Sequence, residues 1–525
     1  MPTTIEVNKQ SVEALLGSGK SKPFVIPEYQ RPYAWTDEQV ETLFEDLWDF
    51  TATSGGTERE SSYFLGSVVS YENEDGEQEI IDGQQRITSL FLLLRAIYTK
   101  LVATPASERT AEANNFIGKI EPTIWRTNKL TGTVDFKNIL LTSRVVNNEG
   151  NEILRSILET GKADEDAKDN YSKNYRHFQE LFDKHSTENP LMVYQFIYAL
   201  LNQAILLPIT ADTQDTALTI FSTLNDRGLP LSDADIFKAK IYNQLAPDDK
   251  KAFIDRWKDL DEQSTDANES IQQLFYYNMF YYRALDKDTK TTTPGVRKYY
   301  AVNKFERLYK PELLDTLFVI LNLWKVVNKG EELEDEAWSK NIKIRQTLDI
   351  LTSYPNEYWK YPVVIYYVCY RNEENFETRF ARFLNKLLME LMTKYLMIPT
   401  INAVKPDILK LNSAIVASDI PTFEFKTIDM TQLEPYIQNP NRNVVRMLLK
   451  TLAYEHQDDL LPAKWEIEHI FPQKWQTNYF PDEPDATIKE KIEHIGNKLP
   501  FEKKLNIVAG NGYFGKKKKE YIASR

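Results

Sequence analysis

Four residues near the C-terminus have the types and spacing that phosphodiester hydrolysis requires. Glu468 and His469 are adjacent in WEIEHIFPQKW (465–475), and Asn497 and Asn506 follow downstream. Such chemistry needs a histidine that deprotonates water, oxygen ligands that hold one divalent cation, and an amide that orients the histidine. We therefore predict that His469 and Asn497 are catalytic and that Glu468 and Asn506 hold the metal.

The same region predicts the elements that would position these side chains. A short strand ends at Glu468-His469, because Pro472 interrupts the pattern soon afterwards. The nine residues from Asn497 to Asn506 suffice for a second strand and the start of a helix. Adjacent side chains on a strand point to opposite sides, so Glu468 would face the metal and His469 the water. The alternative is a surface pair or a hydrogen-bonded core histidine.

Basic residues gather in the last part of the sequence. Residues 498–525 contain eight Lys or Arg against two Glu, a net charge of +6, although the whole chain carries −13. A local basic face of this kind suits a nucleic-acid backbone. It is equally typical of a solvated surface or a disordered tail. The lysines that we predict to contact DNA are Lys503, Lys504, Lys516, Lys517, Lys518 and Lys519.

A second group of chemically capable residues lies in EIIDGQQRITSL (79–90). Asp82-Gly83-Gln84-Gln85-Arg86 stands where an apolar strand gives way to an apolar helix, and Gly83 permits a tight turn. A helix N-terminus attracts anions such as phosphate, Arg86 adds a fork of donors, and the two amides can read a base or ribose. In the alternative reading, Asp82 merely caps the helix and Arg86 pairs with a surface acid.

The surrounding patterns predict how this second group is held. Two β-branched and aromatic runs flank an Asp75-Gly76 turn signal, which indicates a hairpin before the motif. After Arg86 the apolar residues recur at helical spacing to about Val102. Further along, the patterns predict a mostly helical stretch over 104–190, a strand over 203–211, a helix over 215–228 that stops near Asn225, and mainly helices over 246–440.

Composition limits the classes of protein that the chain could be. Its 525 residues suggest about three domains, and 42% hydrophobic residues suffice for sizeable cores. No apolar run is long enough to span a membrane, and the N-terminus lacks a secretory signal. The single cysteine, Cys369, excludes an internal disulfide and a cysteine metal cluster. These features favour a cytoplasmic protein.

The motifs together resemble the GmrSD-like family of type IV restriction enzymes of bacterial phage defence. The matching stretches are IPEYQRPYAW (26–35), IIDGQQRITSLFLL (80–93), IFSTLNDRGLPLSDADIFKAKI (220–241) and the C-terminal motif from IEHIFPQ to the lysine run. The resemblance implies an α+β, multidomain chain. A ParB/sulfiredoxin-like α/β domain that binds or hydrolyses ATP or GTP would span 1–245, a helical domain 246–440, and an HNH nuclease of the ββα-metal kind 441–525, with Mg²⁺ or Mn²⁺.

The resemblance also implies residues that complete the nucleotide pocket. Gln30, Arg31, Asn225 and Arg227 would join the Asp82–Arg86 motif, with Arg31 or Arg86 on the phosphates and Asp82 holding a metal or a water. The sequence departs from the family where Gly-Asn-Leu-Thr-Leu is replaced by Gly-Asn-Lys-Leu-Pro (496–500). Relatives continue beyond the last tyrosine with another helix, so a trimmed or naturally short form is expected.

Two functions from different classes follow from these observations. The first is a nucleotide-regulated, metal-dependent endonuclease or nickase that restricts double-stranded foreign DNA, such as modified phage DNA, and for which the resemblance favours a homodimer. The second is a nucleotide-binding sensor of DNA or of a partner, whose nuclease domain is weak or silent. The sequence leaves open which modification is sensed, whether ATP or GTP is preferred, and whether nucleotide activates or restrains cleavage.

Overall fold

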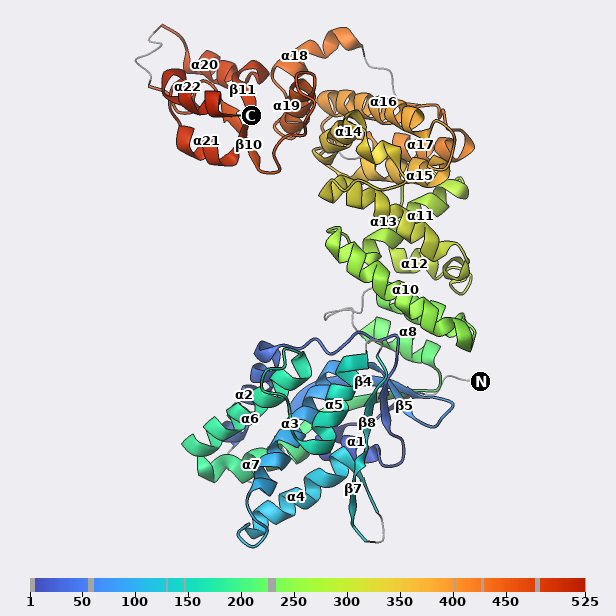
Figure 1. The fold of residues 1–525 in the computed structure, drawn as a ribbon, viewed down its shortest axis with the longest axis vertical. Coiled ribbons are helices and arrows are strands. Elements are labelled where there is room, and N and C mark those ends of the chain that lie inside the picture. Colours follow the sequence, from blue (N-terminus) through green and yellow to red (C-terminus); the bar gives the residue numbers. More distant parts are fainter. Residues whose placement is uncertain are drawn as a thin grey trace. The chain divides into compact units, whose positions relative to one another are not determined.

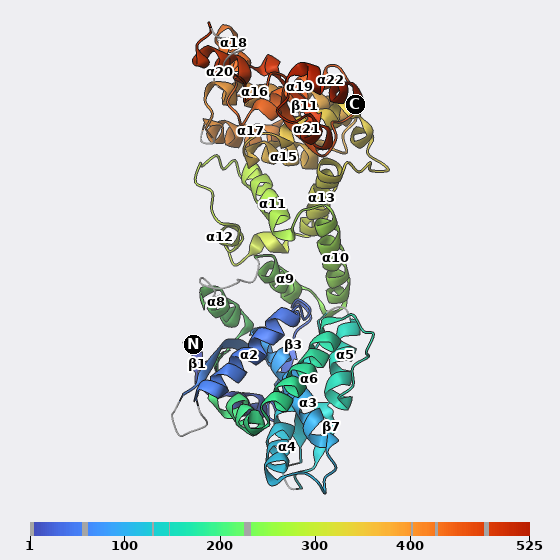
Figure 2. The ribbon, with the colours of Figure 1, turned by 90° about the vertical axis from the view of Figure 1, so that its left-hand side faces the viewer.

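The computed structural model has an α+β, multidomain architecture (Figures 1 and 2). Its contacts divide the chain into two compact units, Met1–Ile254 and Asp255–Arg525. In the part of the chain that the structure describes, no helix combines the length and apolarity needed to cross a membrane. The described residues are 5–54, 61–128, 131–145, 148–224, 233–400, 403–425, 429–476 and 482–524.

A mixed sheet forms the centre of the first unit. Among the described residues, seven strands pair in the order β1-β9-β4-β5-β3-β8, and β2 also pairs with β9. The predicted hairpin is present as the antiparallel pair β4–β5, whereas β3 runs parallel to β5 and β8. The strands are β1 (Ile5–Val7), β2 (Gln10–Ser11), β3 (Phe24–Ile26), β4 (Tyr63–Glu72), β5 (Gln78–Asp82), β8 (Leu141–Ser143) and β9 (Ala204–Ala211). A separate small hairpin pairs β6 (Trp125–Thr127) with β7 (Val134–Ile139).

The helix that follows the Asp82–Arg86 motif lies in the buried core of this unit. In α3 (Gln84–Ala103) every residue from Ile87 to Tyr98 is buried, and α4, α5 and α6 pack against it. Burial of this kind fixes the start of α3 against the end of β5. The other helices are α1 (Val12–Ser18), α2 (Asp37–Ser54), α4 (Ala111–Ile124), α5 (Asn148–Thr160), α6 (Asn170–Glu188), α7 (Val193–Tyr198), α8 (Gln214–Leu224) and α9 (Asp233–Gln244). Helix α10 (Pro247–Asp266) begins in this unit and continues into the second.

The second unit begins with helices that pack through aromatic side chains. Tyr277 stacks on Trp324 at 5.0 Å between ring centroids, and Tyr366 stacks on Phe383 at 4.2 Å. These rings are buried, so the region is a packed helical core. Its helices are α11 (Ile271–Leu285), α12 (Val296–Tyr300), α13 (Leu313–Lys329), α14 (Ile342–Thr352), α15 (Lys360–Tyr370), α16 (Phe376–Met397), α17 (Lys405–Ala417), α18 (Glu434–Gln438) and α19 (Val445–Tyr454).

The C-terminal motif lies on a two-stranded antiparallel sheet. Strands β10 (Trp465–His469) and β11 (Lys498–Glu502) place His469 opposite Lys498. The predicted strand, loop, strand and helix are all present, the helix being α21 (Lys503–Ala509). The structure adds α20 (Asp485–Glu493) within the loop and α22 (Phe514–Ala523) after α21. Helix α19 packs on the Trp465 face of the sheet through Val445 and Leu449.

Candidate functional site

The turn between β5 and α3 strongly favours glycine. Gly83 has φ 86°, a left-handed conformation, and a Cβ atom there would lie 3.1 Å from the Ser67 carbonyl oxygen. Gly83 is also the helix N-cap, and no side chain accepts a capping hydrogen bond. The Asp82 carboxyl accepts from the Gly83 amide, which precedes α3, so the first N–H groups of the helix itself suit an anion.

Two arginines and one carboxylate share this turn. Burial raises the pKa of the Asp82 carboxyl, while the Gly83 amide and the charges of Arg86 and Arg31 act against that rise. Burial likewise lowers the pKa of Arg86, and Asp82 opposes it. Arg31 is exposed. The turn thus brings together one anion and two cations, which leaves a net positive site.

Backbone, and not a surface acid, holds the Arg86 side chain. Its Nη1 donates to the Ser67 carbonyl at 3.0 Å, and within the described ranges no carboxylate lies within ion-pair distance. Gly66 makes room, because a Cβ atom there would lie 3.0 Å from the guanidinium. Arg86 is therefore fixed at the turn by backbone, and Asp82 acts on it through its charge and not through a direct ion pair among the described residues.

The motif glutamines have different roles. Gln85 Oε1 accepts from the N–H groups of Ala34 (2.7 Å) and Trp35 (3.3 Å), and its Nε2 donates to the Pro32 carbonyl at 3.2 Å. Gln30 similarly donates to the Ile81 carbonyl at 3.1 Å. These two amides tie the segment after β3 to the motif.

Gln84 differs from both of these amides. Its side chain is 6% exposed, and its Oε1 has no hydrogen-bond partner in the described part of the chain. A buried acceptor without a partner is costly, so a donor from a ligand would satisfy it. The predicted site residues Asn225 and Arg227 lie outside the described residues.

Loss of Gln85 should therefore lower stability more than loss of Gln84. Gln85→Ala removes three hydrogen bonds, one of them partly buried and two exposed, and we expect the unfolding free energy to fall by about 1–2 kcal/mol. Gln84→Ala is a matched amide deletion one residue away. It removes a buried oxygen that has no hydrogen-bond partner among the described residues, so it should change stability less. Calorimetric melting of both variants measures the difference. Equal melting temperatures would show that Gln85 does not stabilise the link between the motif and the segment after β3.

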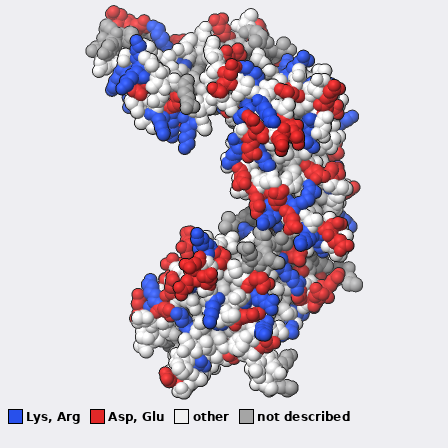
Figure 3. Space-filling model, viewed as in Figure 1, with Lys and Arg blue, Asp and Glu red and all other residues white. Residues whose placement is uncertain are grey.

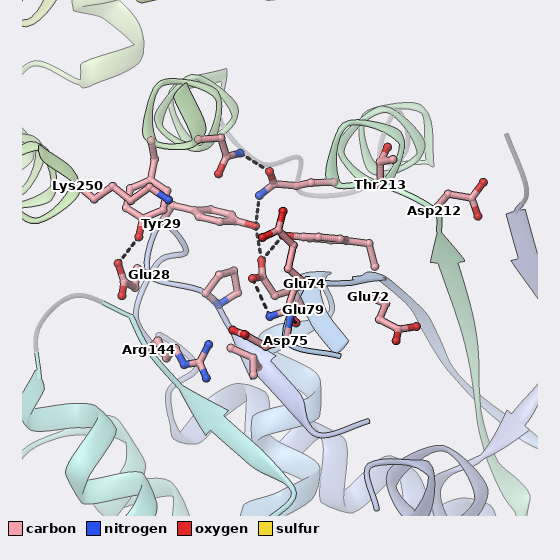
Figure 4. Close-up of a pocket in the computed structure, with 17 residues that line it drawn as sticks. Glu28, Tyr29, Glu72, Glu74, Asp75, Glu79, Arg144, Asp212, Thr213 and Lys250 are labelled. Carbon is pink, nitrogen blue, oxygen red and sulfur yellow. Dashed lines mark hydrogen bonds between the residues drawn. The ribbon is translucent and has the colours of Figure 1, made fainter. Parts of the chain in front are cut away.

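A cavity of about 640 Å³ lies near the turn but does not contain the motif (Figure 4). Its wall includes Glu79, which accepts hydrogen bonds from Tyr71 (2.5 Å) and Tyr29 (3.3 Å), and Gln214 donates to the Tyr29 hydroxyl at 2.6 Å. Burial and Glu79 raise the pKa of Tyr29 well above its ordinary value, so it stays a neutral donor.

The charge of this cavity excludes it as the phosphate site. Six carboxylates line it against two cations, Arg144 and Lys250, and no residue of the Asp82–Arg86 motif is among its lining residues. A triphosphate would be repelled there. Of the two features, the turn is the one that suits an anion. The six acids are Glu28, Glu72, Glu74, Asp75, Glu79 and Asp212.

His469 is the predicted reactive group of the C-terminal site. It ends β10, is half-buried, and has Nε2 of Gln473 3.4 Å from its own Nε2. Burial lowers its pKa, with the charge of Lys498 as the next cause. A lowered pKa keeps the imidazole neutral at pH 7, the form that accepts a proton from water.

Asn497 fixes the chain that follows His469. Its Oδ1 accepts from the Phe471 N–H at 2.7 Å, and its Nδ2 donates to the carbonyls of Phe471 (3.1 Å) and Ile492 (3.0 Å). The Ile470 N–H also donates to the Asn497 carbonyl at 2.9 Å. Asn497 therefore acts on His469 through the backbone and is a positioning residue.

Glu468 does not lie in an open metal site. The side chain is 4% exposed, and Oε1 accepts from Lys517 Nζ at 2.5 Å and from the Tyr521 hydroxyl at 2.7 Å. Lys517 also donates to the His469 carbonyl at 2.7 Å. Asn506 lies on α21, and no group of three His, Cys, Asp or Glu among the described residues could hold a metal. As they lie, the predicted ligands do not fit a divalent cation.

The predicted DNA-contacting lysines do not form one surface. Lys517 is 1% exposed because its ammonium is buried against Glu468, so it cannot reach a DNA backbone in this arrangement. The other five are exposed, and basic side chains gather over α21 and α22 (Figure 3). The exposed members are Lys503, Lys504, Lys516, Lys518 and Lys519.

Comparison with known protein families identifies both ends of the chain. Residues 12–242 match the N-terminal domain of the GmrSD restriction endonuclease, and residues 427–525 match the C-terminal domain of GmrSD restriction endonucleases. The chain belongs to the GmrSD-like family of type IV restriction endonucleases. No curated protein matches it. Membership of the GmrSD-like family makes DNA the partner and phage restriction by DNA cleavage the general activity.

Each GmrSD domain contains supporting residues that the sequence did not reveal. In the N-terminal match, Gly66 and Ser67 hold Arg86, and a glycine inside a strand pattern is the signal that indicates such a close approach. In the C-terminal match, Lys517 and Tyr521 hold Glu468. Their spacing of four residues places both on one face of a helix, which could have separated Lys517 from its neighbours.

Proposed function

We propose that the protein is a nucleotide-regulated DNA endonuclease or nickase that restricts modified phage DNA and cuts at His469. The observation that carries the proposal is His469 itself, whose lowered pKa keeps it a neutral base and whose following chain is fixed by Asn497. Family membership supports the coarser activity, and the His469 geometry supports this residue as its base.

His469 would take the proton from the water that attacks the phosphorus atom. The charge of Lys498, which lies opposite on β11, disfavours the protonated imidazole and so supports its action as a base. The exposed lysines of α21 and α22 would hold the DNA backbone beside the sheet. Asn497 keeps the base in place during this step.

Dependence on Mg²⁺ or Mn²⁺ remains a prediction from the family resemblance. Glu468 already holds the Lys517 ammonium, and we derive no step through a metal. A chelator titration of plasmid nicking, with and without added Mg²⁺ or Mn²⁺, tests the dependence directly. An activity that EDTA does not change would remove the metal from the proposal.

In the N-terminal unit, ATP or GTP would bind at the turn that begins α3. The uncapped N–H groups of α3, with Arg86 and Arg31, would hold the phosphates, and Gln84 Oε1 would accept from the base or ribose. This assignment corresponds to the nucleotide domain of ParB/sulfiredoxin-like type that the resemblance implies. Gln30 and Gln85 would shape the pocket without touching the ligand.

The ion pair between Glu468 and Lys517 favours a second candidate function. If this pair keeps the nuclease silent, the protein would be a nucleotide-binding sensor of DNA or of a partner. Incubating the protein with plasmid, divalent metal and ATP or GTP, against a His469→Ala control, separates the two. Nicking by the wild type alone supports the endonuclease, whereas no nicking by either supports the sensor.

The exposed lysines of α22 should set the salt dependence of DNA binding. Replacing Lys516, Lys518 and Lys519 by glutamine should weaken binding to every sequence. It should also lower the slope of log affinity against log salt by about one unit for each lost contact. Fluorescence anisotropy with a labelled duplex measures both. A matched triple exchange of Lys298, Lys304 and Lys329, exposed lysines of the helical region, should change neither. An unchanged slope in the α22 variant would show that these lysines form only a solvated surface and do not contact DNA.

A further inference from the structure

A cavity of about 760 Å³ lies in the second unit, next to the strand that carries His469. Its lining includes Arg442 and Asn443 just before α19, Arg446 in its first turn, Tyr395 near the end of α16, and Ile467 on β10. The cavity belongs neither to the Asp82–Arg86 turn nor to the lysine helices. It therefore needs an explanation of its own.

The charge of this cavity is purely basic. Arg442 and Arg446 line it, no acidic residue does, and within the described ranges neither arginine lies within ion-pair distance of a carboxylate. Other arginines of the same unit pair with an acid: Arg256 with Asp315, Arg283 with Asp288, Arg307 with Asp286, Arg345 with Glu332 and Arg379 with Asp419. The exposed Arg382, however, has no ion pair among the described residues. In a chain of net charge −13, two arginines without acids beside one cavity point to an external anion.

The local structure fixes one arginine and leaves the other accessible. Arg446 donates from Nη2 to the Trp465 carbonyl at 2.7 Å, and its guanidinium lies 4.0 Å from the centre of the Trp465 ring. Arg442 is exposed, one helical turn earlier in the chain. A fixed guanidinium fork beside an exposed one suits an oxyanion such as phosphate.

The helix start adds to the positive potential at the same place. Helix α19 begins at Val445, and its N-cap Val444 provides no side-chain capping bond. The first N–H groups of a ten-residue helix therefore carry the partial positive charge of its dipole toward the arginines.

The cavity lies on the His469 side of β10. Ile467 and His469 are two residues apart on one strand, so their side chains share a face, and their Cα atoms are about 6.6 Å apart at 3.3 Å per residue. Glu468 points to the opposite face, where Lys517 of α22 meets it. The arginines and the lysine helices thus approach β10 from two different faces.

We propose that Arg442, Arg446 and the start of α19 form a phosphate subsite for the DNA strand that is cut at His469. The proposal rests on the nuclease function argued above and adds a second contact surface to it. The ligand is a backbone phosphodiester, because the site offers guanidinium forks and helix N–H groups for phosphate, and Tyr395 and Ile467 for the apolar faces of a sugar. DNA bound there would be contacted from both faces of β10.

The test removes Arg442, which is exposed and has no structural bond to lose among the described residues. In Arg442→Ala we expect affinity for a labelled 20-base-pair duplex to fall by about tenfold, and the salt slope to fall by about one unit. Arg442→Lys should keep the slope and lose only part of the affinity. Arg382→Ala, which removes an exposed arginine from α16, is the matched control and should change neither quantity.

Binding is measured by anisotropy in EDTA, so its outcome does not depend on cleavage. If Arg442→Ala loses affinity and slope although the wild type never nicks DNA, the subsite stands and the nuclease function falls. If the wild type nicks DNA but Arg442→Ala binds like Arg382→Ala, the subsite alone is overturned. If Arg442→Ala weakens ATP or GTP binding and leaves DNA binding unchanged, the occupant is a free nucleotide and the proposal is also overturned.

Discussion

His469→Ala should abolish DNA cleavage while the protein keeps its fold and its affinity for nucleotide. A general base supplies about 10²–10⁴ in rate, and alanine leaves nothing that can accept the proton of the attacking water. The side chain is only half-buried and makes one weak contact, to Gln473, so stability should change little. Single-turnover nicking of supercoiled plasmid measures the rate, and calorimetry confirms the fold.

The pH profile of cleavage provides an independent check on the same residue. Burial and Lys498 lower the pKa of His469, so its base form persists as pH falls, and the rate should drop only below the ordinary histidine value of about 6.5. His456→Ala, which removes an exposed histidine, should keep both the rate and the profile. Nicking at the wild-type rate by His469→Ala would remove the HNH assignment.

The sequence predicted the local elements at both sites because their signals are local. The turn signal at Asp75-Gly76 lies between β4 and β5, and the apolar spacing after Arg86 continues as α3 to Ala103. Pro472 follows the end of β10 as expected, and Asn497 and Asn506 flank β11 and the start of α21. Each of these features depends on residues within one turn or one helical repeat.

The parts that the sequence missed depend on contacts between distant segments. Residues 104–190 were expected to be mostly helical, yet β8 lies within them and extends the main sheet beside β3, and β6 and β7 form their own hairpin. Parallel pairing of β3 with β8 joins Phe24 to Leu141, a separation over which periodicity carries no information.

The same limit applies to individual side chains. Gln84 and Gln85 are adjacent residues of the same type, but only Gln85 has a hydrogen bond to the segment that follows β3 among the described residues. Lys517 stands within four consecutive lysines, and its burial results from a carboxylate 49 residues earlier. Residue type indicated the chemistry that each group could do, and tertiary packing determined which group remains available for it.

Arg86→Ala should lower nucleotide affinity by roughly ten- to a hundred-fold. The change removes a charge-assisted fork, worth about 1.5–3 kcal/mol, at about 1.4 kcal/mol for each tenfold change in affinity. Gln84→Ala should cost less, because the bond it loses involves a neutral amide. Titration calorimetry with ATP and GTP on each variant measures these losses and shows which nucleotide is preferred.

Arg144→Ala is the control that separates the turn from the acidic cavity. Arg144 lines that cavity and pairs with Glu77 at 2.7 Å, in the same unit as Arg86. If nucleotide binds at the turn, Arg144→Ala keeps its affinity. If nucleotide binds in the cavity, Arg144→Ala weakens it and Arg86→Ala does not. Equal affinity in the wild type and Arg86→Ala would reduce the Asp82–Arg86 motif to a structural turn.

Plasmid nicking by Arg86→Ala extends the experiment from binding to regulation. Arg86 belongs to the first unit and His469 to the second, so the substitution leaves the nuclease residues intact. Any change in nicking at saturating DNA must then come from coupling between the two units. If nucleotide changes the affinity for DNA through this coupling, DNA changes the affinity for nucleotide by the same factor. Faster nicking by Arg86→Ala would mean that nucleotide restrains the nuclease, and slower nicking would mean that it licenses cleavage. If nicking is unchanged while nucleotide affinity falls, the two sites work independently and nucleotide does not regulate cleavage.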